Sequence, residues 1–474
     1  MPERTETMRD AEPTVRVLPP RRYGRRKVLL RGAGLLVPAA LGVAMVGPAC
    51  APVAVTNPVA SAELYVGLAR EHAVAVLDGV TDRVIRRISL ASLGRYALPG
   101  QIGVGPMGAA AVLPLVGSRP NVGLIRPARL VGAAAAGQEE GAIRRCLALL
   151  AGRRSSGAAA EGFQAEEVRV ADDPLATTRP GTYRSGPSVE GLVSDGRGRA
   201  YVLVVEREAA QGGRSGAHTS VAVLDLARGA VLRHLPLDIE PRGRPPGMAP
   251  LPGSQADVMA LAVEPDGSRL YVSTWERSPL SWSRGRVLGL ETASGAVTME
   301  VSLPDGSTIT HFAIGAPPPG VRTLSGGSAE TVVYGVVAAP VLGDDDMGWT
   351  LASYPLLVAF DGDRLDMLAA WPLDELPIGL AVTPEGRRAY LLAGRDWSGA
   401  WSRRLISIDL ASGATTGRWP LPGGCLALAM GPAGKVYVAD TFGDRLWRVD
   451  TRTNTLLGSL SLPGAPLALA ARPA

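Results

Sequence analysis

A short sequence that recurs along the chain constrains its fold more than any other feature. It reads LAVEPDGSRLYVST at Leu261–Thr274, LAVTPEGRRAYLLA at Leu380–Ala393 and LAMGPAGKVYVAD at Leu428–Asp440. Each copy is followed by a second apolar segment that runs into a turn, such as RVLGLETASGAV. A period of roughly 50–65 residues built from short strands and tight turns is typical of a circular array of small sheets, so we predict a β-propeller.

Counting copies of one strand gives the number of blades. In a blade whose strands are lettered A to D from the inside outwards, the LYV-type segment is strand B. Six copies carry a tyrosine and a degenerate copy lies near 109–117; the tyrosines are Tyr65, Tyr201, Tyr271, Tyr334, Tyr390 and Tyr437. We therefore predict an all-β fold of seven four-stranded antiparallel blades. Blade 2 is degenerate, with a partly helical insertion at about 133–172.

The two ends of the folded region support this count. The fold begins at Glu63 with a strand B that has no strand A before it, and it ends at Ala465–Ala474 with a strand A that has no strand B after it. Pairing these two strands would complete blade 1 and leave no open edge in the ring. The aspartates that end strand C are expected to accept backbone hydrogen bonds in the C–D turns; they are Asp78, Asp225, Asp409 and Asp450.

The strand-B segments resemble the YVTN repeats of a β-propeller family. The resemblance is carried by Tyr65–Gly67, Tyr271–Thr274 and Tyr437–Asp440, and it extends over most of Glu63–Ala471. It implies a propeller fold and a place among surface-layer and periplasmic binding proteins. The structural relatives of that family also include lactonases and cofactor-bearing enzymes, but none of their catalytic motifs can be matched here.

Residues 1–50 are predicted to be an export signal, followed by a linker at 51–62 and the propeller at 63–474. Arg25 and Arg26 precede the apolar run Gly32–Val46, which resembles a twin-arginine signal. Cys50 lies where a bacterial lipoprotein is cleaved and lipidated. The alternatives are an uncleaved signal anchor and cleavage after Ala62. Each of these places the propeller outside the cytoplasm, either tethered to the outer side of the cytoplasmic membrane or periplasmic or extracellular.

The charge balance excludes nucleic acid as an expected partner. The chain has 49 Lys and Arg and 44 Asp and Glu, and nine of the former and four of the latter precede Cys50. The remainder therefore carries 40 of each and no net charge, so it lacks the basic surface that binds nucleic acid. Of the other cysteines, Cys425 is expected to be a buried small side chain, with a disulfide to Cys146 as the alternative.

Tryptophan and arginine gather in the predicted B–C loops of blades 4 to 6, on one face of the ring. The residues predicted to bind a ligand there are Trp275, Trp282, Trp349, Trp397, Trp401, Arg277 and Arg395. Indole rings stack on sugars and anchor protein partners, and arginine stacks on the rings. We therefore expect a protein or glycan of the cell envelope as the partner. Alternatively, these tryptophans pack together to hold the loops, or they join copies of the chain.

A second hypothesis is an extracytoplasmic hydrolase, lyase or oxidoreductase that uses the centre of the ring. Its candidate residues are Glu190, Asp257 and His311, on or beside the innermost strands of blades 3, 4 and 5. Channel-lining polar residues are ordinary in propellers, so binding without chemistry is the leading hypothesis. The sequence has four histidines and none at metal-ligand spacing, and we expect neither a metal nor a cofactor. The acidic run Asp344–Asp346 is expected to be a solvated turn rather than a calcium site.

Overall fold

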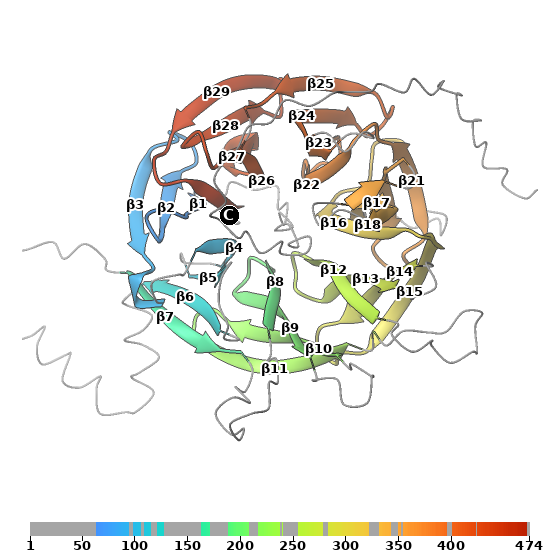
Figure 1. Ribbon diagram of the computed structural model, residues 1–474, viewed down its shortest axis with the longest axis horizontal. Helices are drawn as coiled ribbons and strands as arrows, with labels where there is room; N and C mark the ends of the chain where they lie inside the picture. The colour runs from blue at the N-terminus through green and yellow to red at the C-terminus, as the bar shows by residue number, and fades with distance from the viewer. Residues whose placement is uncertain are drawn as a thin grey trace, which may run out of the picture. The chain divides into compact units, whose positions relative to one another are not determined.

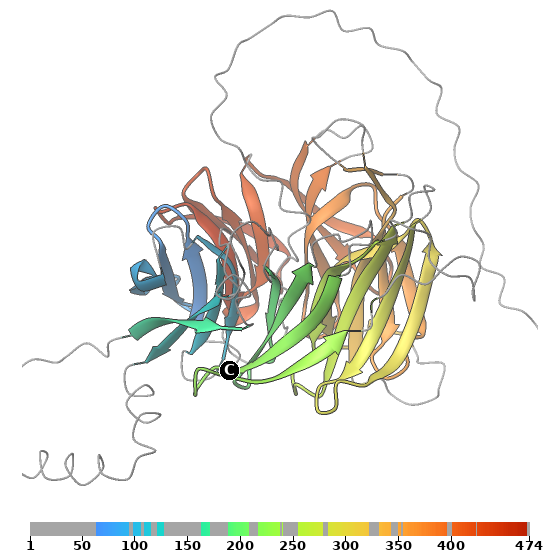
Figure 2. The same ribbon diagram turned by 60° about the horizontal axis from the view of Figure 1, so that its bottom comes forward.

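The structure is a computed structural model in which the described residues form seven four-stranded antiparallel sheets arranged in a ring (Figure 1). It describes residues 63–93, 98–105, 109–114, 121–127, 163–170, 188–207, 217–237, 239, 255–277, 283–321, 331–342, 349–351, 354–395, 401–422 and 424–471. The blades stand side by side around the axis, as the tilted view in Figure 2 shows. The predicted all-β seven-bladed propeller is confirmed.

The first three blades contain the strands that follow, each blade written from strand A to strand D. Blade 1 is β30 (Pro466–Ala471), β1 (Glu63–Leu68), β2 (Ala73–Asp78) and β3 (Val84–Ser89). Blade 2 is β4 (Pro99–Val104), β5 (Ala110–Pro114), β6 (Asn121–Pro127) and β7 (Phe163–Arg169). Blade 3 is β8 (Ser188–Ser194), β9 (Arg199–Arg207), β10 (Ala217–Asp225) and β11 (Ala230–Leu237).

The other four blades repeat this order. Blade 4 is β12 (Gln255–Val263), β13 (Arg269–Arg277), β14 (Ser283–Glu291) and β15 (Val297–Asp305), and blade 5 is β16 (Thr308–Gly315), β17 (Val332–Ala338), β20 (Leu356–Asp361) and β21 (Met367–Pro372). Blade 6 is β22 (Leu376–Val382), β23 (Arg388–Arg395), β24 (Trp401–Asp409) and β25 (Thr415–Pro420). Blade 7 is β26 (Cys425–Met430), β27 (Lys435–Asp440), β28 (Arg445–Asp450) and β29 (Thr455–Ser461).

Short elements complete the described regular structure. They are two single-turn 3₁₀ helices, η1 (Ala91–Leu93) and η4 (Pro432–Gly434), and a small hairpin, β18 (Pro340–Leu342) with β19 (Trp349–Leu351). None of the helices in the described part of the chain is long and apolar enough to cross a membrane.

The ring closes by pairing the two ends of the chain, as predicted. Strand β30 pairs antiparallel with β1, from Leu64 opposite Ala471 to Leu68 opposite Pro466. The amide of Ala69 continues the contact by donating a hydrogen bond to the Ala465 carbonyl at 3.0 Å. Blade 1 is thus built from both ends of the fold, and β1 has a paired strand on each side.

The core lies between adjacent blades rather than at the centre of the ring. Ala111 and Val122 of blade 2, for example, pack against Leu192 and Val202 of blade 3 in one buried cluster. Because both faces of each sheet are covered by a neighbour, strands such as β1 have buried side chains at nearly every position. This two-sided burial explains why the strands are apolar at consecutive positions instead of alternating.

The strand-B tyrosines that define the repeat link the blades. All six are fully buried. The hydroxyl of Tyr201 donates to the Gly267 carbonyl of blade 4 at 3.3 Å, and that of Tyr390 donates to Asn454 Oδ1 of blade 7 at 3.0 Å. Tyr271 and Tyr437 reach the next blade in the same way. In these four blades, therefore, the repeated tyrosine fastens its own sheet to a turn of the following one.

The C–D turns have the predicted aspartate geometry. Asp78 Oδ1 accepts hydrogen bonds from the amides of Val80 at 3.1 Å and Thr81 at 2.7 Å. Equivalent bonds are made by Asp225, Asp409 and Asp450. The hydrogen bonds from Thr81 to Asp78 also hold the pKa of this carboxyl below its ordinary value.

Two connections depart from the expected pattern of tight A–B and C–D turns. The A–B connection of blade 5 is long, because β16 ends at Gly315 and β17 begins at Val332. The second is the C–D connection of blade 2, between β6 and β7. The range predicted as an insertion, about 133–172, includes β7, so this part of it is strand D of the blade rather than an insertion. The rest of the predicted insertion up to Gly162 lies outside the described residues.

Candidate functional site

The B–C and D–A connections open on one face of the ring, which we call the loop face, and they vary widely in length. In blade 5 the B–C connection carries the hairpin β18–β19. In blade 7 the corresponding connection between β27 and β28 is a single turn. The D–A connections range similarly, from Asp305–Thr308 between blades 4 and 5 to Leu237–Gln255 between blades 3 and 4. Variable connections on a rigid scaffold are where binding surfaces are usually found.

Trp275, predicted to lie in a loop, is instead part of strand β13, and its side chain is 3% exposed. It pairs with Gly285 of β14, so the two residues lie on the same face of the blade 4 sheet. A Cβ at Gly285 would overlap the Ser307 carbonyl oxygen and lie 2.9 Å from Thr308 Cα, which shows how closely blade 5 approaches here. For Trp275 the structure therefore favours the packing alternative.

The other predicted ligand-binding residues are only partly within the described structure. The backbone of Trp349 lies in β19 opposite Leu342, and Trp401 begins β24 opposite Arg395. Arg277 ends β13 opposite Ser283. Trp349 thus lies within the blade 5 connection, whereas Arg277, Arg395 and Trp401 lie at the strand ends that border the connections of blades 4 and 6. Outside the described structure are residues Trp282 and Trp397, Asp344–Asp346, and the side chains of Trp349, Trp401, Arg277 and Arg395.

A buried ion pair beneath this part of the loop face was not predicted from the sequence. Arg286 Nη2 lies 3.3 Å from Glu276 Oε1, and both side chains are almost completely buried. Arg286 Nη1 also lies 3.6 Å from Glu300 Oε1. Because the three residues come from β13, β14 and β15, their proximity depends on strand register, which the sequence does not display. The ion pair fixes the ends of β13 and β14, where the blade 4 connection begins.

The innermost strands share a β-bulge, and the three catalytic candidates can be located relative to it. Each of the seven carries a β-bulge at the same level, where one residue is skipped in the pairing with strand B. From blade 1 to blade 7 the skipped residues are Leu467, Gly100, Glu190, Met259, Thr310, Ile378 and Leu426. Bulges re-aim side chains, and Leu426 is 43% exposed although it lies on an innermost strand.

Glu190, Asp257 and His311 occupy three different positions relative to these bulges. Glu190 is the skipped residue of β8 and the only charged member of that set, and it accepts a hydrogen bond from Ser188 Oγ at 3.0 Å. Asp257 lies two residues before the bulge of β12, and His311 follows the bulge of β16. Glu190 and Asp257 are half-buried, whereas His311 is buried.

The surroundings of His311 are those of a structural residue. Burial lowers the pKa of its imidazole to about 4, despite a hydrogen bond with the backbone of Ile378 in blade 6. Its Nδ1 lies 2.9 Å from Thr310 Oγ1. The equivalent position in blade 2 is Gln101, whose Oε1 accepts a 2.6 Å hydrogen bond from the Leu192 amide of blade 3. Both side chains therefore join one innermost strand to the next.

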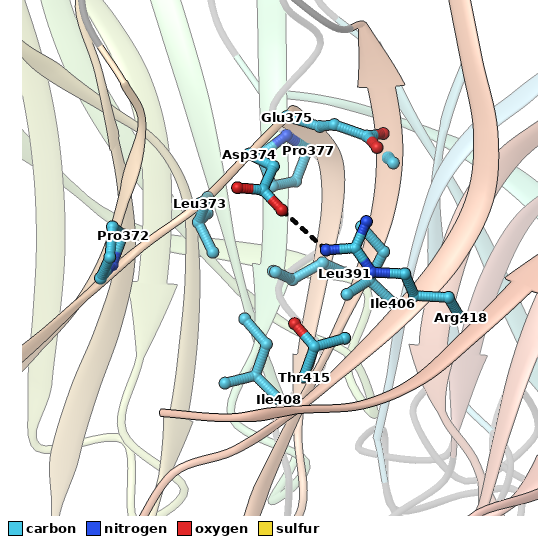
Figure 3. A pocket seen from close by; sticks show the side chains of 11 residues that line it. Pro372, Leu373, Asp374, Glu375, Pro377, Leu391, Ile406, Ile408, Thr415 and Arg418 are labelled. Carbon is cyan, nitrogen blue, oxygen red and sulfur yellow. Dashed lines mark hydrogen bonds and ion pairs between the residues drawn. The ribbon is translucent and has the colours of Figure 1, made fainter. Parts of the chain in front are cut away.

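A crevice between blades 5 and 6 is lined by both apolar and charged side chains (Figure 3). Its wall is apolar, formed by Leu373, Pro377, Leu391, Ala393, Ile406 and Ile408. Asp374 and Arg418 face one another in the crevice, and Asp374 Oδ2 lies 2.7 Å from Arg418 Nη2. Glu375, which follows Asp374 in the chain, also lines the crevice. The cavity volume of about 30 Å³ admits a group the size of one or two water molecules.

The described residues contain no group of three or more His, Cys, Asp or Glu side chains placed to hold a metal ion. Cys425 is a buried free thiol, as predicted, and Cys146, its partner in the alternative disulfide, lies outside the described residues. Burial, together with the nearby Asp440 carboxylate, raises the pKa of this thiol to about 12, so it is protonated and unreactive at neutral pH.

Comparison with known proteins assigns neither a family nor a function to this chain. No family model matches the chain, and no curated protein matches it in sequence. Similar solved structures include hydrazine synthase from Kuenenia stuttgartiensis, with 14% identity and a TM-score of 0.46 over 90% of this chain and 100% of that one. Dihydro-heme d1 dehydrogenase NirN has 14% identity and a TM-score of 0.47 over 89% and 77%, and Citrobacter koseri AztD has 13% and 0.39 over 86% and 97%. At such low identity their functions do not transfer.

Proposed function

We propose that this chain is an exported, membrane-tethered propeller that binds a protein or glycan of the cell envelope on its loop face. The observation that supports this most is the spread of connection lengths on that face, including the β18–β19 hairpin that carries Trp349. Indole rings on such connections suit stacking on a sugar or anchoring a protein surface. Trp275 is not part of the proposed surface, because its side chain is buried.

The proposed location rests on the leader sequence. Arg25 and Arg26 would direct export, and Cys50 would carry the lipid that holds the propeller at the membrane. The test is cell fractionation of the full chain beside a Cys50→Ser variant. Lipidation predicts that the wild-type chain is in the membrane fraction and the variant is released. If both chains fractionate alike, the lipid anchor is excluded.

The binding test compares the full wild-type chain with a Trp282→Ala/Trp397→Ala variant in affinity capture from envelope extracts and on a glycan array. We expect the variant to lose the captured ligand while its melting temperature is unchanged. Phe442→Ala is the matched control, because Phe442 is 75% exposed in the short B–C turn of blade 7. If Phe442→Ala loses the ligand and the double variant retains it, the ligand binds outside the connections of blades 4 to 6.

His311 gives no comparable support to an enzymatic function. A buried His311 with a pKa of about 4 is neutral at physiological pH, and its hydrogen bonds join it to Thr310 and to the backbone of Ile378. A general base needs a pKa near the working pH and access to a substrate proton. His311 instead has the burial and the partners of an inter-blade link.

A further inference from the structure

Glu375, in the crevice between blades 5 and 6, has a buried carboxylate oxygen that needs a hydrogen-bond donor. Its side chain is 7% exposed, and its Oε1 lies 3.3 Å from Arg404 Nε. The second oxygen, Oε2, is buried and has no hydrogen-bond partner among the described residues. A buried carboxylate oxygen without a donor is destabilising, so a donor from outside the described structure is expected to satisfy it.

The remainder of the crevice indicates what kind of donor fits. Two carboxylates line it. Asp374 pairs with the guanidinium of Arg418, and Glu375 pairs through Oε1 with Arg404, so the lining presents Glu375 Oε2 as an anionic acceptor without a donor among the described residues. The rest of the wall is mainly aliphatic. A ligand that matches both features has a positively charged donor at the end of a short carbon chain. The small volume limits the part that enters to the charged head and the carbon next to it.

We propose that this crevice binds the primary ammonium group of an aliphatic amine, with the ammonium at Glu375 Oε2 and the carbon next to it against Leu373 and Ile406. We infer that the amine comes from another molecule, because Lys435 is engaged elsewhere and Lys27 lies in the predicted export signal. Lys27 and Lys435 are the only lysines of this chain, and Lys435 Nζ lies 2.9 Å from Asp82 Oδ2 in the joint between blades 7 and 1. The source is either a free amine or a lysine side chain of a partner protein.

The test is a titration of the full chain, labelled at the isoleucine δ1 methyl groups, with n-butylammonium at constant ionic strength. The methyl signals of Ile406 and Ile408, which line the crevice, report occupancy; Ile406→Val and Ile408→Val assign them. We expect saturable shifts with n-butylammonium and none with n-butanol, which has the same shape without the charge. Glu375→Gln should weaken binding by about tenfold or more, whereas Glu385→Gln, an exposed carboxylate elsewhere in blade 6, should leave it unchanged.

Three outcomes would overturn the proposal: no shift at saturating amine, equal binding of n-butanol, or unchanged binding to Glu375→Gln. If Glu375→Gln does not fold, Glu375→Asp, which withdraws the carboxylate by one methylene, should also weaken binding. A blocked peptide, Ala-Ala-Lys-Ala-Ala, and its Nε-acetylated form separate the two sources. Tighter binding of the unmodified peptide than of n-butylammonium indicates a protein partner, and weaker binding indicates a free amine. Neither result depends on the B–C connections that carry the tryptophans.

Discussion

The hydroxyl of Tyr437 in blade 7 donates a 2.6 Å hydrogen bond to Asp82 Oδ1 in blade 1. Lys435 Nζ and Arg448 Nη1, also from blade 7, lie 2.9 Å and 2.6 Å from the other oxygen of Asp82. Burial opposes ionisation of Asp82, but these hydrogen bonds outweigh it and hold the pKa of the carboxyl below its ordinary value. One carboxylate thus joins the last blade to the first, beside the paired strands β30 and β1.

Replacing this carboxylate should weaken the ring. We expect Asp82→Asn to lower the free energy of unfolding by about 2–4 kcal/mol, because it leaves two cations of blade 7 without their shared anion. Urea unfolding followed by circular dichroism measures the change. Asp363→Asn is the control, since the Asp363 side chain is 70% exposed and its ion pair with Arg269 should contribute less than about 1 kcal/mol. Equal losses in the two variants would mean that the Asp82 cluster does not stabilise closure.

Stability should depend on pH through His311. The pKa of its imidazole is about 4 in the folded chain and about 6.5 when unfolded, so the unfolded state binds more protons between these values. The contribution of His311 is therefore complete above pH 6.5 and is lost as the pH falls towards 4, by about 3 kcal/mol. His311→Gln, which introduces the side chain found at Gln101 in blade 2, should flatten this slope. Urea midpoints from pH 4 to 7 would show whether it does.

Gly285 should tolerate no side chain. In Gly285→Ala the new Cβ meets the backbone of Ser307 and Thr308, which cannot move without shifting blade 5. We expect a loss of about 2–3 kcal/mol in the free energy of unfolding. Gly315→Ala is the matched control, because the nearest atoms to its Cβ are 3.5 Å away. Thermal unfolding of the two variants measures this difference in stability. Similar melting temperatures would contradict the close packing of blades 4 and 5.

Trp275→Ala should act as a core truncation. Removing a side chain that is 3% exposed should lower the free energy of unfolding by about 3–5 kcal/mol. If ligand capture persists in the fraction that remains folded, Trp275 has a packing role alone. If the variant is as stable as the wild type but no longer binds the ligand, Trp275 is part of the ligand-binding surface.

The architecture could be predicted from the sequence because its signals are local and repeated. The strand-B tyrosines marked six of the seven blades, and the aspartates such as Asp78 marked the C–D turns. The unmatched strands at Glu63 and Ala465 predicted the closure of the ring. Each of these signals is contained in a few adjacent residues, so no knowledge of the tertiary structure was needed.

The candidate site was harder to predict because it depends on register and on strand ends. Trp275 was placed in a loop because it follows the LYVST strand, whereas β13 extends two residues beyond it, to Arg277. The pair Arg286 and Glu276 is created by the alignment of neighbouring strands. Glu375 lies in a D–A link whose sequence, LDELP, has no mark of burial. Such positions become visible only when the packing of one blade against the next is known.

The most direct test of the proposed loop-face surface is hydrogen–deuterium exchange of the full chain with and without its captured ligand. We expect slower exchange in peptides that cover β18–β19 and the connection between β23 and β24. We expect no change in the turns of the opposite face, such as 291–297 and 409–415. Protection confined to those turns, or to the innermost strands, would contradict the assignment of ligand binding to the loop face.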